Sequence, residues 1–227
     1  ETFECFCTRR EILEAPSAPH APPGAYPGTC RELTDAQRAA RRRDRPAAVR
    51  LRAVVREFAV HDVLHGEYNG DVDDFVLVRG DGIPAYNLAV VVDDAGAGID
   101  QVVRGDDLLS STPRQAYLAT RLGYVVPEYA HVPMVLSPST GSGGEQVGSA
   151  GEQVGSGGEP IRLAKRDGAV TLEQLGMRGY DAPAVVGMMA VSLRLAAPGE
   201  PVTRERLLER FDPTALERAP WVFVPPG

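Results

Sequence analysis

The sequence predicts a globular α/β protein, and three observations support that fold class. The chain has 227 residues, 43% of them hydrophobic, which is enough to build a sizeable core. The segment Ala85–Val92 becomes continuously apolar, as expected of a helix or strand that enters a buried sheet. Val102-Val103 is followed by a loop at 104–107 and by a helix that opens at Thr112-Pro113, with the Thr112 hydroxyl as its N-cap and proline at the first helical position. Strand, loop and helix in that order form the βα unit of a nucleotide-binding α/β fold.

The composition excludes several classes of protein. The net charge is −7, from 24 basic and 31 acidic side chains, which argues against a generally basic nucleic-acid coat. No apolar run approaches the roughly 18 residues of a membrane-spanning helix, so we expect no membrane partner. Three cysteines cannot form a closed disulfide framework, so we expect a reduced, cytoplasmic protein rather than a small secreted scaffold.

The N-terminal stretch is rich in cysteine and proline, and we expect it to be irregular. Cys5 and Cys7 cannot easily bridge each other, but both can reach one zinc ion, with Cys30 as a third thiolate. The intervening loop offers His20 and Tyr26 as a fourth ligand, and chemistry alone ranks His20 first because histidine is the commoner zinc ligand. The alternative is a set of three reduced structural thiols.

An arginine run follows the N-terminal stretch. Thr34-Asp35-Ala36-Gln37 has the pattern of a capping box and predicts that a helix begins here. Between Arg38 and Arg56, eight arginines face one acid, Asp44, which gives a local charge of +7. One interpretation is a solvated helix face. The other is contact with a phosphate backbone, since counterion release rewards such clustering.

The rest of the chain alternates between predicted elements and a linker. Val49–Arg52 and Phe75–Val78 are predicted strands. Residues 137–160 contain Gly-Glu-Gln-Val-Gly-Ser twice and are typical of a flexible linker. A helical stretch is predicted from Ala184 to Leu195, and a last helix is capped by Thr203.

Two further groups of residues could carry chemistry. Tyr86 and Arg104 lie near the ends of two apolar segments and could hold a small carboxylate, because arginine binds carboxylates bidentately. Arg104 could instead pair structurally with Asp106 or Asp107. Lys165 is the one lysine among the 24 basic residues and lies in a basic, glycine-ended segment, where a loop lysine can place its ammonium on a phosphate.

Two long motifs resemble a known family. The run Asp81–Asp94, followed by Arg-Gly-Asp-Asp-Leu-x-x-x-Thr-Pro-Arg-Gln at 104–115, resembles the catalytic core of glutamyl-tRNA synthetases and their paralogues. Residues 162–166 resemble a degenerate form of the KMSKS loop of class I synthetases. The Cys-x-Cys start, the Tyr26-to-Cys30 segment and the end of the chain soon after that loop are most similar to the glutamyl-Q tRNA(Asp) synthetases, which lack an anticodon-binding domain.

The resemblance implies a class I synthetase Rossmann-like catalytic core with a zinc-binding insertion and a helical C-terminal segment. We expect this core to be incomplete and parallel-sheeted, with the HIGH-motif half lying before Glu1. The implied divisions are a zinc-binding subdomain at 1–34, an insertion or tRNA-facing segment at 35–80, the second half of the nucleotide-binding core at 81–136, a flexible insert at 137–160, the KMSKS-like loop region at 161–176 and the helical C-terminal segment at 177–227.

The resemblance also implies a two-step reaction. ATP and glutamate form glutamyl-adenylate, and the glutamyl group then passes to queuosine in the anticodon of tRNA(Asp). By the same resemblance Tyr86 and Arg104 bind glutamate, and Lys165 contacts the ATP phosphates, with Mg²⁺ accompanying ATP. The expected protein is a cytoplasmic monomer. The alternatives are a truncated or discriminating glutamyl-tRNA synthetase that charges the tRNA 3′ end, and a catalytically inactive zinc- and RNA-binding fragment.

The remaining implied site residues form two sets. The resemblance moves the fourth ligand of a structural Zn²⁺ ion from His20 to Tyr26, and it assigns a full KMSKS-like motif. The implied zinc ligands are Cys5, Cys7, Tyr26 and Cys30, and the implied motif residues are Arg162, Leu163, Ala164, Lys165 and Arg166.

Overall fold

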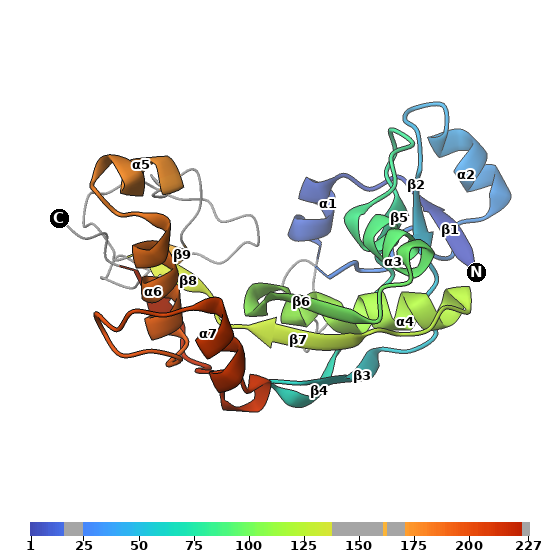
Figure 1. The fold of residues 1–227 in the computed structure, drawn as a ribbon. Helices are drawn as coiled ribbons and strands as arrows, with labels where there is room; N and C mark the ends of the chain where they lie inside the picture. The colour runs from blue at the N-terminus through green and yellow to red at the C-terminus, as the bar shows by residue number, and fades with distance from the viewer. Residues whose placement is uncertain (16–24, 138–160, 163–170, 224–227) are drawn as a thin grey trace. The chain divides into compact units, whose positions relative to one another are not determined.

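The structure is a computed structural model that describes residues 1–15, 25–137, 161–162 and 171–223. The chain divides into two compact units, whose elements are labelled in Figure 1. Within the described residues, unit 1 comprises Glu1–Val102 and Leu108–Tyr129. Unit 2 comprises Val103–Asp107 and the described residues from Ala130 onward.

The elements of the first half alternate between short strands and helices. They are β1 (Thr2–Cys5), α1 (Arg9–Glu14), α2 (Asp35–Arg41), β2 (Ala48–Leu51), β3 (Glu57–Asp62), β4 (Gly66–Asp71), β5 (Val76–Val78), α3 (Tyr86–Ala97), β6 (Gln101–Gly105) and the 3₁₀ helix η1 (Asp106–Ser111). The second half continues with α4 (Thr112–Leu122), β7 (Glu128–Val132), β8 (Val135–Ser137), β9 (Ile161–Arg162), α5 (Leu172–Met177), α6 (Ala182–Ser192), α7 (Arg204–Arg210), the 3₁₀ helix η3 (Pro213–Ala215) and β10 (Trp221–Val222).

The start of the N-terminal stretch, in β1 and α1, is regular where the sequence predicted irregular structure, whereas residues 25–34 contain no helix or strand, as predicted. β1 pairs antiparallel with β2, and β2 pairs antiparallel with β5. α1 has a full capping box, in which Thr8 and Glu11 satisfy each other's backbone N–H groups. The prediction was wrong because β1 finds its partner more than 40 residues away, in the register Cys5↔Ala48, and no local pattern encodes that pairing.

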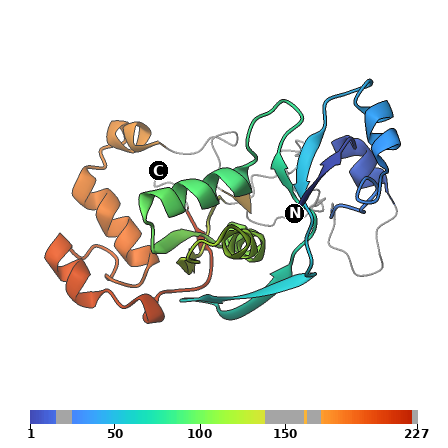
Figure 2. The ribbon, with the colours of Figure 1, turned by 90° about the vertical axis from the view of Figure 1, so that its right-hand side faces the viewer.

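The middle of unit 1 packs two helices and a hairpin around one apolar core. α3 and α4 lie side by side, and the β3–β4 hairpin covers α4 on its other side (Figures 1 and 2). The core contains Leu51, Phe75, Val91, Tyr117 and Leu118. The apolar run from Ala85 is a helix, α3, which ends where Gly98 adopts a left-handed conformation at φ 69°.

The larger sheet is mixed and has the strand order β4-β3-β7-β6. β3 pairs parallel with β7 at Asp62↔Tyr129, as the sequence predicted for the core. β3 and β4, however, are antiparallel, because the three residues Val63-Leu64-His65 are too short a connection for a parallel crossover. The expectation of a parallel sheet therefore holds for only part of it.

Helix α4 begins as predicted at Thr112-Pro113, but its cap differs from the prediction. Ser111 occupies the N-cap position and makes no capping bond with its side chain. Thr112 is already helical, and its Oγ1 donates to the carbonyl of Leu108 at 3.4 Å. The preceding 3₁₀ helix η1 runs directly into α4, so the backbone is helical before the expected hydroxyl cap.

Unit 2 carries the helical C-terminal segment that the sequence predicted. Its small sheet has the order β10-β8-β9, with β8 parallel to β10 and antiparallel to β9. α6 begins two residues before the predicted Ala184, with Asp181 as its N-cap, and Thr203 caps α7 as predicted. No helix in the described part of the chain is long and apolar enough to cross a membrane. The repeats of the predicted linker lie outside the described residues.

Candidate active site and metal centre

The structure brings three thiols and one phenol together in unit 1. The sulfur atoms of Cys5, Cys7 and Cys30 all lie within 4.8 Å of one another. Cys7 Sγ and Cys30 Sγ are 3.6 Å apart, and Cys5 Sγ is 3.5 Å from the hydroxyl of Tyr26. All three cysteines are free thiols. We call these four residues the Cys–Tyr cluster.

Local structure explains why residues separated by more than 20 positions meet here. Cys5 ends β1, and the next residue, Phe6, donates its backbone N–H to Cys30 Sγ at 3.5 Å. Gly28 turns the chain with φ 82°, a conformation that favours glycine, and its carbonyl accepts from Arg31 N–H at 2.9 Å. The turn folds Cys30 back onto Tyr26, whose hydroxyl accepts from the backbone N–H of Cys30 at 2.7 Å.

The surroundings of the cluster shift the pKa of two of its three thiols in opposite directions. Burial and, to a smaller extent, the neighbouring sulfurs of Cys5 and Cys30 together raise the pKa of the Cys7 thiol to about 12. Burial also opposes ionisation of Cys5, but its hydrogen bonds to Tyr26 and the Cys7 backbone and the charge of Arg50 together lower the pKa of Cys5. Burial is the main cause that raises the pKa of Tyr26.

The donor set fits a zinc ion. Tetrahedral zinc with Zn–S bonds of about 2.3 Å separates neighbouring sulfurs by roughly 3.8 Å, close to the 3.6 Å between Cys7 and Cys30. A bound cation also favours the thiolates, which offsets the burial that raises the pKa of Cys7. Cys5, Cys7 and Cys30 would supply thiolates, and the Tyr26 oxygen is the nearest further donor among the described residues. His20, the alternative that chemistry ranked first, lies outside the described residues.

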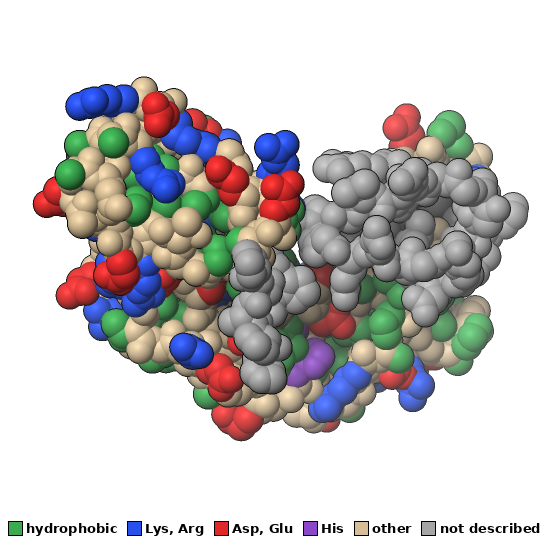
Figure 3. All heavy atoms as spheres, turned by 180° about the vertical axis from the view of Figure 1, so that it is seen from behind, with side chains coloured by type: hydrophobic (Ala, Val, Ile, Leu, Met, Phe, Trp, Pro, Cys, Tyr) green, Lys and Arg blue, Asp and Glu red, His purple; other side chains and the backbone are tan. Residues whose placement is uncertain are grey.

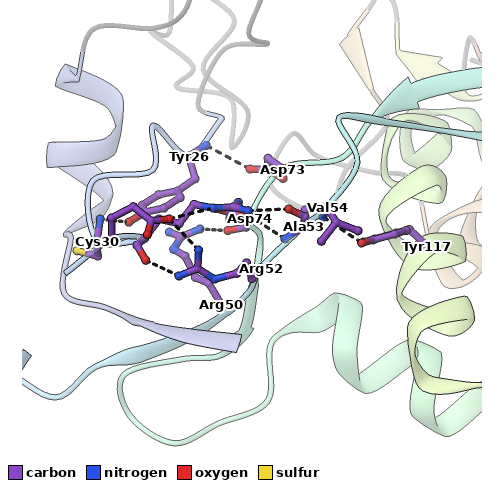
Figure 4. A network of polar contacts seen from close by, with 11 residues as sticks. Tyr26, Cys30, Arg50, Arg52, Ala53, Val54, Asp73, Asp74 and Tyr117 are labelled. Atoms are coloured by element: carbon purple, nitrogen blue, oxygen red, sulfur yellow. Dashed lines mark hydrogen bonds and ion pairs between the residues drawn. The ribbon is translucent and has the colours of Figure 1, made fainter. Parts of the chain in front are cut away.

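Two adjacent aspartates connect the Cys–Tyr cluster to the rest of unit 1. Asp73 accepts from the Tyr26 backbone N–H at 3.2 Å with one carboxylate oxygen and from Arg114 Nε at 2.8 Å with the other. Arg114 belongs to helix α4 and to the 104–115 motif. Asp73 therefore links the metal-binding candidate directly to the predicted catalytic motif. Figure 4 shows the bond from Tyr26 to Asp73 within the larger network.

Asp74 is the buried member of this acidic pair, with 6% of its surface exposed. Its carboxylate pairs with Arg31 and accepts from the backbone N–H of Ala53 at 2.9 Å. Its carbonyl accepts from Arg50 Nη1 at 2.8 Å, and the Arg50 guanidinium lies 3.8 Å from the centre of the Tyr26 ring (Figure 4). Asp74 thus joins the strand β2 to the loop that carries Cys30.

The arginine run has a third role that the sequence did not suggest. Arg42 binds Glu4 with two hydrogen bonds, at 2.9 and 2.6 Å, and Arg52 pairs with Glu32 at 2.8 Å. Arg38 pairs with Asp35, and Arg50 is buried in the network described above. Arg41 Nη1 also contacts Cys30 Sγ at 4.0 Å, so at least five of the eight arginines make contacts within the fold. In agreement, basic and acidic side chains are interspersed on the face of the molecule in Figure 3.

The predicted glutamate-binding arginine lies in unit 2, near the carboxyl end of strand β6. Arg104 Nε donates to Nε2 of His131 at 2.9 Å, and His131 is completely buried on strand β7. A Cβ atom on the next residue, Gly105, would lie 2.8 Å from the sulfur of Met134 and 2.7 Å from Asp107 Oδ1, so a larger residue here would require those side chains to move. Arg104 and Gly105 are thus fitted closely against the β7–β8 segment.

The predicted glutamate-binding tyrosine lies in unit 1, at the first position of α3. Tyr86 is 57% exposed, so its ring is accessible. Its neighbour Asn87 accepts from the buried side chain of Gln115 at 2.9 Å, through which α4 holds the first turn of α3. Gln115 is the last residue of the 104–115 motif. The motif therefore supports the helix end that presents Tyr86.

The KMSKS-like segment begins from strand β9. The backbone of Arg162 pairs with Leu136 on β8, which follows directly on the segment that packs against Arg104 and Gly105. Leu163, Ala164, Lys165 and Arg166 lie outside the described residues. Within unit 2, the start of the KMSKS-like segment and Arg104 are therefore both attached to one short stretch of chain, residues 131–137.

Comparison with known proteins gives the family. Residues 1–141 match the family model of the class I tRNA synthetases (E and Q), catalytic domain. The chain belongs to this family. The match begins in the Cys–Tyr cluster and includes both Tyr86 and the complete 104–115 motif.

The curated proteins that are similar to this chain include two kinds of enzyme. The chain is 55% identical over all 227 residues to the glutamyl-Q tRNA(Asp) synthetase of Nocardia farcinica, and covers 65% of that protein. It is 37% identical to the protein of that name from Deinococcus radiodurans, of which it covers 69%. It is also 35% identical to the glutamate–tRNA ligase of Nitrosospira multiformis, of which it covers 44%. The chain spans roughly half to two thirds of the length of the relatives it matches first.

Solved structures support the synthetase fold. The glutamate-tRNA synthetase from Elizabethkingia anophelis matches with a TM-score of 0.62 and 24% identity, over 85% of this chain and 40% of that one. A glutamate tRNA ligase from Elizabethkingia meningosepticum matches with a TM-score of 0.61. The predicted α/β class I synthetase fold is confirmed.

The sequence missed three residues that organise these sites. Asp73 and Asp74 stand at the start of a predicted strand, where acidic residues usually face solvent, and nothing local shows that they bridge distant arginines. His131 is the lone histidine on a strand whose neighbouring residues are Tyr129, Ala130 and Val132. That isolation was the available signal, since a histidine buried on an apolar strand requires a hydrogen-bond partner.

Proposed function

We propose that this protein activates glutamate with ATP and transfers the glutamyl group to queuosine in the anticodon of tRNA(Asp). In the first step a carboxylate oxygen of glutamate attacks the α-phosphorus of ATP, which gives glutamyl-adenylate and pyrophosphate. In the second step the glutamyl group passes to queuosine and AMP leaves. An unpaired anticodon base suits this role, since RNA-binding proteins prefer splayed single-stranded bases.

One observation carries the proposal. The alignment with the Nocardia farcinica glutamyl-Q tRNA(Asp) synthetase covers every residue of this chain at 55% identity. It therefore includes the Cys–Tyr cluster, both predicted glutamate ligands and the KMSKS-like segment, in the same order. The geometry supports it further, because Arg104 lies at the carboxyl end of a strand, where ligands bind in open α/β folds.

The proposed residues act by binding and positioning. Arg104 binds a carboxylate of glutamate with its guanidinium, and the exposed Tyr86 contributes a second contact to the amino acid. Lys165 stabilises the negative charge that moves onto the leaving pyrophosphate, within the motif Arg162–Arg166. Mg²⁺ accompanies ATP. No covalent enzyme intermediate is required, because held reactants and fixed positive charge lower the barrier.

The Cys–Tyr cluster is proposed as a structural zinc site. Its four side chains are all on unit 1, and the network through Asp73 connects it to helix α4 rather than to solvent. Zinc there would supply folding energy and would take no part in the reaction. We propose further that the protein works as a cytoplasmic monomer, and that arginines of the 38–56 run without internal partners contact tRNA.

The proposal is tested with the full-length protein. Glutamate-dependent exchange of pyrophosphate into ATP should occur without added tRNA, and Lys165→Ala should reduce its rate by about a hundredfold without lowering Tm. Radiolabelled glutamate should then transfer to queuosine-containing tRNA(Asp) and not to the same tRNA lacking queuosine. Unchanged exchange in the Lys165 variant would remove that residue from the ATP site.

The similarity to glutamate–tRNA ligases supports a second candidate, transfer to the tRNA 3′ end. A tRNA(Asp) that contains queuosine but lacks its 3′-terminal adenosine separates the two functions. Transfer at the full rate supports the anticodon reaction. Loss of transfer to this tRNA, together with transfer to a 3′-intact tRNA, would establish the ligase reaction instead.

A further inference from the structure

We propose that Arg50 strengthens zinc binding as the buried counter-charge of the Cys–Tyr cluster. The inference rests on the structural zinc site proposed above, because it takes Zn²⁺ as the ion that the cluster binds. The observation that carries it is a buried guanidinium that lies over the ring of one of the four donors. The central carbon of the Arg50 guanidinium is 3.8 Å from the centre of the Tyr26 ring.

The sheet of β1, β2 and β5 holds this guanidinium in place. Arg50 lies on the central strand β2, opposite Phe3 on β1, and only 6% of its surface is exposed. The ring of Phe3 packs against that of Tyr26, with 6.0 Å between their centres. Nη1 of Arg50 donates to the backbone carbonyl of Asp74 at 2.8 Å, as Figure 4 shows. Arg50 is therefore fixed beside the donor atoms before any ion binds.

The charge of Arg50 has no acidic partner nearby. Within the described part of the chain no carboxylate forms an ion pair with Arg50, and its buried Nε makes no hydrogen bond. The adjacent carboxylate of Asp74 is already used, because it pairs with Arg31 and accepts from the backbone N–H of Ala53. A buried guanidinium is costly unless an anion compensates it. The Cys–Tyr cluster is the remaining source of negative charge beside it.

A zinc ion would make the cluster negative. Three thiolates bring three negative charges against the two positive charges of Zn²⁺, so the centre has a net charge of −1, or −2 with Tyr26 as phenolate. An anionic centre that is largely shielded from water is itself destabilised, and a fixed cation at short range offsets that cost. The buried arginine and the metal centre thus compensate each other.

The thiol of Cys5 already responds to Arg50. Burial by itself raises the pKa of Cys5, but the hydrogen bonds to Tyr26 and the Cys7 backbone, together with the charge of Arg50, outweigh burial and lower that pKa. The same positive charge would favour the deprotonated, metal-binding form of the thiol when an ion is bound. This agrees with the geometry of the guanidinium over Tyr26.

Two nearby arginines show what is particular to Arg50. Arg52 lies over a ring of the same small core, 5.4 Å from the centre of Phe3, but it pairs with the carboxylate of Glu32 at 2.8 Å. Arg41 has its Nη1 4.0 Å from Cys30 Sγ, but its side chain is exposed, so water and salt screen its charge. Of these three arginines, only Arg50 is buried against a donor of the cluster without a carboxylate partner.

The test measures zinc affinity in the full-length protein. Arg50→Gln keeps a donor for the carbonyl of Asp74 but removes the charge, whereas Arg50→Lys keeps the charge. Competition with a chromophoric chelator gives the Kd for zinc. Arg50→Gln should raise it between about tenfold and a hundredfold, the usual effect of losing an outer-shell partner of a metal site. Arg50→Lys should stay within about threefold of the wild type.

Arg52→Gln is the matched control. It removes a neighbouring arginine that also donates to the loop before β2, through the carbonyl of Arg31, but its charge is already paired. Its Kd for zinc should change less than about twofold. If Arg50→Gln does not fold, the Lys variant decides: a Kd within about threefold of the wild type supports the counter-charge, and a rise of about tenfold contradicts it.

The outcomes separate this inference from the zinc site on which it rests. Zinc binding by the wild type with an unchanged Kd in Arg50→Gln, or equal rises in the Gln and Lys variants, would overturn the role of the Arg50 charge and leave the metal site standing. A wild-type protein that binds no zinc would overturn the metal site itself and the counter-charge with it.

Discussion

The loop region of unit 1 and the C-terminal helices of unit 2 are stabilised in different ways. In unit 1 the Cys–Tyr cluster, Asp73 and Asp74 connect segments that are far apart in sequence, through contacts that are buried or half-buried. In unit 2 the helices α5, α6 and α7 each begin at a side chain that caps its own helix, and the ion pair between Arg210 and Glu200 is partly exposed.

The difference follows from what each region can bury. The N-terminal stretch has few large apolar side chains, and its core of Phe3, Phe6, Tyr26 and two cysteines is small. A small core needs additional cross-links, which the polar network provides and which a zinc ion would complete. The C-terminal helices form from local signals, and single substitutions there should act locally. The following predictions test this comparison, beginning with the largest expected effect.

The strongest test removes the proposed metal. Wild-type protein should contain about one zinc per chain, and Cys30→Ser should contain almost none and unfold at a lower temperature. The expected loss in the free energy of unfolding is about 4 kcal/mol, the stabilisation given by a ligand at a thousandfold its Kd. Metal analysis and calorimetry measure both quantities. His20→Ala is the matched control, and zinc loss in that variant would exchange Tyr26 for His20 as fourth ligand.

The next test breaks the buried acidic contact. Asp74→Asn removes the buried counter-charge of Arg31 and leaves only its longer pair with the exposed Glu32. It should reduce the free energy of unfolding by about 2–3 kcal/mol, less than for a fully buried pair because Arg31 is 31% exposed. Chemical denaturation of the whole protein, followed by a signal from unit 1, measures this loss in the free energy of unfolding. Glu14→Gln breaks the exposed pair with Arg10 and should cost no more than about 0.5 kcal/mol. Similar losses in both variants would contradict the contrast between buried and exposed pairs.

A local effect is expected in unit 2. Asp181 accepts from the backbone N–H of Ala184 at 2.9 Å, so Asp181→Ala should destabilise helix α6 by about 1 kcal/mol. Hydrogen exchange should accelerate in α6 amides and stay unchanged in β1 and β2. Asp181→Asn keeps a capping oxygen and should behave almost like the wild type. Faster exchange in unit 1 as well would show that the units are not stabilised separately.

The smallest effect should come from an exposed ion pair. Hydrogen bonds from Arg210 and from the Ala197 backbone lower the pKa of Glu200 to about 2. Because the folded pKa is the lower one, the carboxylate stabilises the segment fully above pH ~4.3, and this contribution is lost as the pH falls toward 2. Glu200→Gln should flatten that acid dependence in hydrogen exchange near α7. An unchanged pH profile would mean that the pair contributes nothing.

Much of the fold could be predicted because its signals are local. The capping box at Thr34, the proline at the start of α4 and the cap at Thr203 are readable in four or five residues. The predictions that failed also have a physical cause, because each depended on contacts or burial that a short stretch of sequence does not show. β1 was missed because its partner is distant in sequence, and the apolar run from Ala85 could not be assigned to helix or strand, since burial on several faces removes the periodicity that separates them.

The sequence by itself determined the family, the candidate residues and the chemistry that they can carry. Its long motifs predict a tyrosine, an arginine and a lysine as substrate-binding residues, and its cysteine spacing predicts a metal site. Only the tertiary structure decided which distant groups meet: Tyr26 with the thiols, Asp73 with Arg114, and His131 with Arg104. The physical reason is that hydrogen bonds and ion pairs depend on distances of about 3 Å, and chain topology sets those distances for residues far apart in sequence.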